Sequence, residues 1–455
     1  MRKFSNPKLL PKGPVPVARV LWAAPIIIAK PVLSNNAARG QPQDLEYFQY
    51  FQEQTILELC GGFEEPLWDR YLLQACQEAP FVRHIALSLA ALGRAERTTL
   101  ARESEQHEAY ALHKYSSSLP EIRKYLAGTK NPDPRMFLVT GLLIFLFEFQ
   151  QGNRMMATKQ LRTTLALFKN MRKIRSEKYT HVHRLNYPDT FEEAIVEMVV
   201  RLENHITLDL VDQTARIKGN GSSALGIVHV HHAWPVIFPT EFSTVFEAQR
   251  LHNYIQYWGS PNFPSDASRC ISAYSQLALG KACDIPKPRI VSFCEYSRGL
   301  RELTSWRRSF LPLLAKLRAG KSSELACALI IYIQSLCFTM VIKRRLGWVL
   351  DDSVPSPGVV VEEYDESVDD VCRTMVDAGR ELCVDKHFMR CFTFDPGVLP
   401  TLLLVMFGTE DLDIRFEITE ILRDMIPRKE SVWDSVDVSK LADVLYSHGS
   451  SLRIP

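Results

Sequence analysis

The stretch Pro80-Phe-Val-Arg-His-Ile-Ala-Leu-Ser-Leu-Ala-Ala-Leu92 carries the pattern that decides the fold class. It predicts a helix that begins with a proline, where the missing N–H does no harm because that group has no intrahelical partner. The sequence before it repeats apolar residues at three- and four-residue steps, which places them on one helical face. These residues are Leu45, Phe48 and Phe51, followed by Phe63, Leu67 and Tyr71.

A second helical segment begins at Asp133-Pro134, where Asp133 is a candidate N-cap, and runs through Phe149. It is broken near Gly152, and a further helix follows from Met155 to about Met171. Two helices joined by so short a turn pack antiparallel, so this region predicts a helical hairpin.

Helical patterns return along the rest of the chain, and alternating apolar and polar strands are scarce. The predicted fold is therefore all-α, a multi-helix array of antiparallel helical hairpins with no substantial β-sheet. The further predicted helices are Phe191–Val211, Val245–Tyr257, Tyr296–Leu317, Glu324–Leu346, Glu366–Cys383, Pro400–Phe407, Leu412–Met425 and Val438–Tyr446.

The first 43 residues differ from the rest of the chain. Met1–Gln43 contains seven prolines and seven basic residues but no acidic residue. Each proline removes a backbone donor and restricts the residue before it, so this segment predicts a flexible basic arm or linker. The sequence thus divides into this arm, residues 1–43, and a helical domain over residues 44–450.

Bulk composition is that of a globular intracellular protein. The formal net charge of the 455-residue chain is only +2. The overall electrostatic field of the protein therefore does not favour non-specific binding to nucleic acid or to a membrane. The ten cysteines include no CxxC pair, which argues against a structural zinc site and favours reduced, buried thiols. Leu325–Ile342 carries no charge, but it is barely long enough to span a bilayer and predicts a buried core helix. Val20–Ala29 only loosely imitates a signal peptide.

No catalytic or metal-binding motif stands out. His107 lacks a histidine at i+4, and the cluster His229-Val-His231-His232 lacks a nearby carboxylate; His181 and His183 are weaker still. Gly219-Asn-Gly221 has the wrong spacing for a dinucleotide site. Phe145-Leu-Phe147-Glu-Phe149 could line an effector pocket, but a core helix is the more ordinary interpretation. The sequence therefore assigns no catalytic, cofactor-binding, metal-binding or DNA-binding residue, and no cofactor.

A series of short blocks runs in order through most of Glu46–Tyr446. They are Phe51-Gln-Glu-Gln-Thr55, Cys60-Gly-Gly-Phe63, Trp68, Leu73-Gln74, Glu78–Leu92, Gly141–Phe149 with Gln151-Gly-Asn153, Phe246-Glu-Ala-Gln-Arg250, Phe392-Thr-Phe-Asp395, Gly397-Val-Leu-Pro400, Asp413-Ile-Arg415, Ile421-Leu422 and Val432-Trp-Asp-Ser435. Together these blocks resemble the helical regulatory region of fungal Zn2Cys6 (binuclear zinc cluster) transcription factors.

The chain also departs from that family. Pro400-Thr401-Leu402 stands where the family often has paired prolines before a leucine, and the six closely spaced cysteines of the DNA-reading module do not occur. Direct DNA binding is therefore not expected, because no element could read base edges. Two explanations stay open: the chain acts with a DNA-binding partner, or an upstream exon that encodes the cluster is missing from the sequence.

The resemblance implies a nuclear, non-enzymatic regulator of metabolic genes, including those of secondary metabolism. It would act through protein partners, either a DNA-binding factor or the transcription machinery, and through a small-molecule effector. The chain could form a homo-oligomer under this prediction, and it is not expected to bind a membrane. The alternative is a helical pathway protein or enzyme, encoded with a metabolic gene set, that uses the His229–His232 loop.

Overall fold

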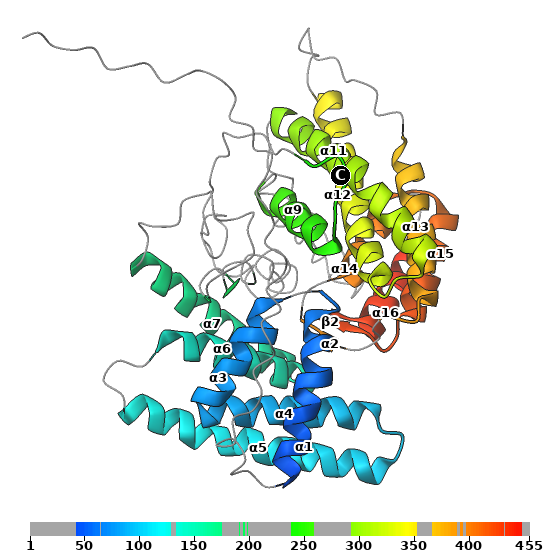
Figure 1. Ribbon diagram of the computed structural model, residues 1–455. Coiled ribbons are helices and arrows are strands. Elements are labelled where there is room, and N and C mark those ends of the chain that lie inside the picture. The colour runs from blue at the N-terminus through cyan, green and yellow to red at the C-terminus, as the bar shows by residue number, and fades with distance from the viewer. Residues whose placement is uncertain are drawn as a thin grey trace, which may run out of the picture.

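The computed structural model describes residues 42–174, 238–258, 293–352 and 366–447, together with residues 191, 194, 195 and 198. Within these ranges residues 64, 129–132, 389–391, 395–396 and 432 are not described. The described residues are mainly helical and form two hydrophobic cores, one from the N-terminal and one from the C-terminal helices (Figure 1). The predicted all-α fold is confirmed.

The N-terminal core is built from α-helices and two π-helical turns. These elements are α1 (Pro42–Tyr50), η2 (Phe51–Thr55), α2 (Ile56–Cys60), η3 (Leu67–Tyr71), α3 (Leu72–Glu78), α4 (Pro80–Arg97), α5 (Ala101–Gly128), α6 (Pro134–Gln150) and α7 (Arg154–Ile174). Helix α1 begins at Pro42, so the last two residues assigned to the arm belong to the helical body, since proline is tolerated in a first helical turn. The rest of the predicted arm lies outside the described residues.

Helix α4 is the centre of this core, as the opening stretch predicts. Pro80 occupies its first turn, and the side chains of Val82, Ile85 and Ala90 have no exposed area. It packs against α5, α6, α1 and α3. The long helix α5 was not predicted, since its sequence is largely polar and contains Pro120.

The predicted hairpin is present as α6 and α7. The Asp133 carboxylate accepts a hydrogen bond from the backbone N–H of Arg135 at 2.9 Å, which confirms Asp133 as the N-cap. Gly152 has a φ of 77° in the turn, a conformation that glycine adopts without strain. The helices approach closely at Gly141, where an added Cβ would overlap the Thr164 hydroxyl.

One predicted helical face is wrong. Phe63, Leu67 and Tyr71 were expected to share a face, but Gly61 and Gly62 have φ of 64° and 88° and end α2. Phe63 consequently packs against the C-terminal core, whereas Leu67 is buried in the N-terminal one. Left-handed glycines commonly end helices in this way.

The C-terminal core contains α9 (Val245–Trp258), α11 (Phe293–Gly320), α12 (Leu325–Asp352), α13 (Val368–Val384), α14 (Leu399–Gly408), α15 (Leu412–Asp424) and α16 (Ser435–Ser447). Helix α12 lies at its centre and packs against α9, α11, α13 and α14. Among the described residues, it is the one helix long and apolar enough to cross a membrane, and 83% of its Leu325–Arg344 stretch is buried inside the protein. The prediction of a buried core helix is confirmed.

A small sheet lies between the two cores. Strand β2 (Lys429–Glu430) pairs parallel with β1 (Phe392–Thr393) and antiparallel with β3 (Trp433–Asp434), in the order β1-β2-β3. Phe392 and the following Phe394 insert into the N-terminal core, although the segment belongs to the C-terminal half of the chain. The Phe394 N–H donates to the Leu59 carbonyl at 3.1 Å. This segment therefore joins the two cores.

His252, on α9, is fully buried beside Trp306, with 5.0 Å between the ring centroids. Burial lowers its pKa from the ordinary 6.5 to about 3. The unfolded chain therefore binds a proton there before the folded chain does as the pH falls. The contribution of neutral, buried His252 to the free energy of unfolding is therefore complete above pH 6.5, and it is lost progressively between pH 6.5 and pH 3.

We expect acidification from pH 7 to pH 5 to cost the wild type about 2 kcal/mol more unfolding free energy than it costs His252→Gln, at about 1.4 kcal/mol per pH unit. Urea unfolding of both proteins at the two pH values measures this difference. Equal losses in both proteins would show that the pKa of His252 does not differ between the folded and unfolded states.

Candidate functional site

Of the histidines considered from the sequence, His107 lies within the described residues. His229, His231 and His232 lie outside the described residues, as do His181, His183 and the Gly219–Gly221 loop. Among the described residues, no group of three or more His, Cys, Asp and Glu side chains could hold a metal ion. The His107 ring is hydrogen-bonded to the Tyr47 hydroxyl through Nδ1 at 2.6 Å and belongs to the packing of α1 on α5.

The aromatic stretch on α6 is part of the core. Phe145 and Phe147 are almost completely buried, and Phe147 stacks on Tyr115 with 4.0 Å between ring centroids. Phe145 meets Phe394 edge-on at 6.0 Å. The core interpretation of this stretch is confirmed.

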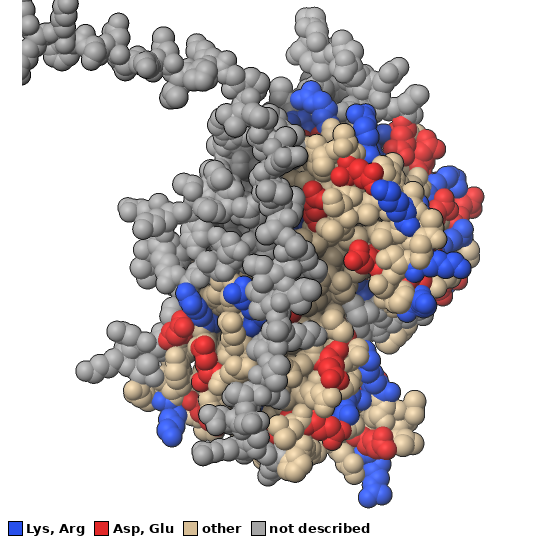
Figure 2. All heavy atoms as spheres, in the orientation of Figure 1, with Lys and Arg blue, Asp and Glu red and all other residues tan. Residues whose placement is uncertain are grey.

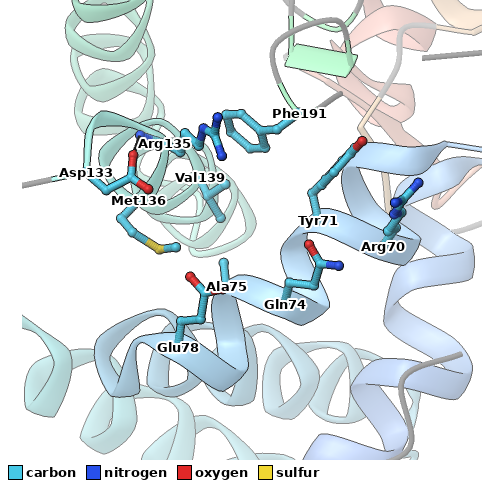
Figure 3. A pocket seen from close by; sticks show the side chains of 10 residues that line it. All are labelled: Arg70, Tyr71, Gln74, Ala75, Glu78, Asp133, Arg135, Met136, Val139 and Phe191. Carbon is cyan, nitrogen blue, oxygen red and sulfur yellow. Dashed lines mark hydrogen bonds between the residues drawn. The ribbon is translucent and has the colours of Figure 1, made fainter. Parts of the chain in front are cut away.

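A pocket of about 280 Å³ opens between α3 and the first turns of α6 (Figure 3). This volume lies just below the usual range for ligand pockets in proteins. Phe191, the first described residue after α7, closes one side. The lining residues are Arg70, Tyr71, Gln74, Ala75, Glu78, Asp133, Arg135, Met136, Val139 and Phe191.

Helical spacing explains the α3 side of the pocket. Arg70, Gln74 and Glu78 follow one another at four-residue steps, so they form a row along one side of η3 and α3. The buried Ala75 contributes to the floor, and η3 joins α3 without a break. Such π-helical turns occur often beside functional sites, because the extra residue shifts the side chains that follow it.

Arg135 and Phe191 lie on the opposite wall, and aromatic rings and guanidinium groups from the two sides meet at the pocket. Tyr71 and Phe191 meet edge-on, with 5.7 Å between ring centroids. The Arg135 guanidinium lies 5.9 Å from the centre of the Phe191 ring, and that of Arg70 lies 5.2 Å from the Tyr71 ring. Both arginines are therefore placed by cation–π contacts, which are worth about 0.5–1 kcal/mol each at exposed sites.

Two positive and two negative side chains surround an apolar floor. Arg70 and Arg135 are balanced by Glu78 and Asp133, so the lining has no net formal charge. Its described residues include no serine, threonine, cysteine or histidine that could act as a nucleophile–base pair. The four charged side chains around an apolar floor offer both ionic and apolar contacts to a small molecule.

Three residues from the family-like blocks have structural roles. Arg83 donates to the Cys76 carbonyl at 3.2 Å, and His84 lies 3.2 Å from the Glu121 carboxylate on α5. Burial lowers the pKa of His84, although Glu121 acts in the opposite direction. Asp434 accepts a hydrogen bond from the Val436 N–H at the start of α16. These contacts join α4 to α3 and α5 and cap the start of α16.

The described cysteines are free thiols, and all but Cys383 are buried. Burial raises the pKa of Cys76, Cys327 and Cys372 to about 12. A thiol with so high a pKa has almost no thiolate at neutral pH and is chemically inert. For this part of the chain, the prediction that the thiols are mostly buried is confirmed.

The pocket residues were not predicted as a site. The Arg70, Gln74 and Glu78 row is visible in the sequence, but the same spacing is found on any solvated helix face. What distinguishes it is the wall that α6 and Phe191 place opposite, and sequence spacing alone contains no signal for that contact.

Comparisons with family models, curated proteins and solved structures find no match for the chain. Its function is therefore proposed from its own residues and from the resemblance of their sequence blocks.

Proposed function

We propose that the chain is a nuclear, non-enzymatic regulator of transcription that acts through protein partners and a small effector. The observation that carries this proposal is the order of the sequence blocks from Phe51 to Ser435, which resemble the helical regulatory region of fungal Zn2Cys6 factors. The all-α architecture is compatible with that resemblance.

The positions of several blocks give the proposal physical support. The blocks that contain Phe394, Gly397 and Trp433 meet at the sheet between the two cores. They are therefore residues on which this fold depends. If the chain shares an architecture with the regulatory region it resembles, we expect residues of the family-like blocks at contacts between the two cores.

The charge distribution favours contact with protein over direct contact with DNA. On the face shown in Figure 2, basic and acidic side chains are interspersed over the described surface. Many arginines of the C-terminal core are paired, for example Arg318 with Glu381 and Arg380 with Glu417. Phosphate binding depends on clustered cationic side chains, because it is driven by the release of counterions.

Transcript measurements test the proposal. Deleting the gene should change the transcript levels of metabolic genes, most readily those located beside it, and reintroducing the wild-type gene should restore them. Unchanged levels across those genes under conditions where the protein is expressed would contradict the proposal.

A tethering experiment tests the mechanism separately. The chain, fused to a DNA-binding module of known sequence preference, should raise or lower expression of a reporter that carries the module's site. The module alone is the control. If the fusion leaves the reporter unchanged, the idea of regulation through protein contacts is wrong.

A further inference from the structure

The pocket between α3 and α6 contains charged groups that the fold does not use. Arg70 contacts the ring of Tyr71, and neither Arg70 nor Glu78 has an ion pair or side-chain hydrogen bond within the described structure. Gln74, between them, is exposed and likewise has no such partner there. In Figure 3 the three side chains lie along the α3 side of the pocket. They are available to a ligand.

The two charges are separated along the helix. Arg70 and Glu78 are eight residues apart, which corresponds to about 12 Å between their Cα atoms at 1.5 Å per residue. The acidic end is formed by Glu78. Across the pocket, Asp133 already caps α6 and Arg135 contacts the Phe191 ring, so that wall carries one charge of each sign. The apolar residues Ala75 and Val139 are buried in the floor of the pocket.

These features select a chemical class of ligand. A ligand with only a negative charge would be attracted by Arg70 and repelled by the acidic end. A ligand with only a positive charge would be repelled by Arg70 and attracted by the acidic end. Since like charges placed together are unfavourable, a molecule with only one charge satisfies half of the pocket. A zwitterion with a carboxylate at one end, an ammonium group at the other and an apolar or aromatic body satisfies both halves.

We propose that the α3–α6 pocket binds a small zwitterion of about dipeptide size. Its carboxylate is recognised at the Arg70 end and its ammonium group at the Glu78 end. Its apolar body lies on Ala75 and Val139, beside the Tyr71 and Phe191 rings. This inference deepens the effector part of the proposed function, but binding can be measured on the purified protein without reference to transcription.

Three probes of nearly equal size isolate the contribution of each charge. Alanyl-phenylalanine has both charges, its N-acetyl derivative lacks the ammonium group, and its C-terminal amide lacks the carboxylate. Isothermal titration of the full chain should give saturable binding of the zwitterion, about fivefold or more tighter than that of either derivative, a factor consistent with a solvent-accessible ion pair.

Variants assign the two ends of the pocket. Arg70→Gln should abolish the preference for the dipeptide over its amide, and Glu78→Gln should abolish the preference over the acetylated form. Arg123→Gln and Glu105→Gln, on the exposed surface of α5, are matched controls and should leave all affinities unchanged. Gln74→Trp should block the pocket and remove binding, while thermal unfolding verifies that the variant is folded.

Several outcomes would overturn the proposal. These are an absence of saturable binding of all three probes, equal affinities for them, or unchanged binding to folded Gln74→Trp. Tighter binding of a singly charged derivative would also overturn the zwitterion assignment. None of these results would bear on the transcript test, so failure of the ligand assignment is distinguishable from failure of the proposed function.

Discussion

Replacing Glu430 by glutamine is expected to lower the free energy of unfolding by about 3–5 kcal/mol, the usual cost of removing one partner of a buried ion pair. Glu430 is completely buried, and its carboxylate lies 2.5 Å from Nε of the buried Arg428. The same carboxylate accepts hydrogen bonds from the backbone N–H groups of Gly397, Val398 and Leu399, at 2.9, 3.1 and 2.9 Å.

The size of the effect follows from these four contacts. Helix α14 begins at Leu399 without a side-chain cap of its own, so Glu430 satisfies N–H groups that would otherwise be buried and unbonded. Its negative charge also lies at the positive end of the helix dipole. A glutamine amide cannot accept from all of these donors, and it removes the carboxylate charge that faces the buried Arg428 guanidinium.

Urea unfolding monitored by circular dichroism measures the loss. Glu241→Gln is the matched control, because Glu241 pairs with the exposed Lys316 and should contribute less than about 1 kcal/mol. The double variant Arg428→Met/Glu430→Gln should be more stable than Glu430→Gln alone by at least about 1 kcal/mol, since it removes the buried guanidinium together with the carboxylate charge. Similar losses for Glu430→Gln and Glu241→Gln would contradict the assignment.

The contacts around this ion pair could not be predicted from the sequence. Gly397-Val-Leu-Pro400 and Val432-Trp-Asp-Ser435 were recognised as blocks, but their meeting through Glu430 was not. The strands contain two residues each, and Phe392 pairs with Lys429, which is distant along the chain. Alternation over so few residues has no measurable period, so the sheet could be found only from the three-dimensional structure.

The helices were easier to predict, and for a specific reason. Helices α4 and α6 combine a long apolar pattern with a terminal signal, Pro80 in one and Asp133-Pro134 in the other. Patterns of this length and these capping residues are local in the sequence. The π-helical turn η3 was not predicted, because one additional residue in a turn is decided by packing against neighbouring elements.

The candidate pocket depends still more on tertiary contacts. Arg70, Gln74 and Glu78 have the spacing of a solvated helix face, and in a different fold they would be one. Their significance comes from Arg135 and Phe191, which the packing of the N-terminal core brings to the other side. The helical body is therefore predictable from the sequence, whereas the position of this pocket is not.

Replacing Phe394 by alanine is expected to cost about 3–5 kcal/mol and to weaken the link between the two cores. Its ring has no exposed area and meets Trp68 at 4.7 Å and Phe145 at 6.0 Å between centroids. Its backbone N–H donates to Leu59. Removing the ring leaves a cavity among aromatic neighbours that cannot easily close, so both the transfer free energy and the packing are lost.

The Phe394→Ala substitution should change the number of unfolding transitions as well as the free energy of unfolding. Phe394 comes from the C-terminal half of the chain but packs in the N-terminal core, so it couples the unfolding of the two. In the wild type we expect one unfolding transition, and in Phe394→Ala we expect two that separate in calorimetry. Phe416→Ala, at a site 49% exposed on α15, is the matched control and should cost at most about 1 kcal/mol with the transition unchanged. A Phe394→Ala protein that unfolds in one transition, with a loss no greater than that of the control, would show that the small sheet does not couple the cores.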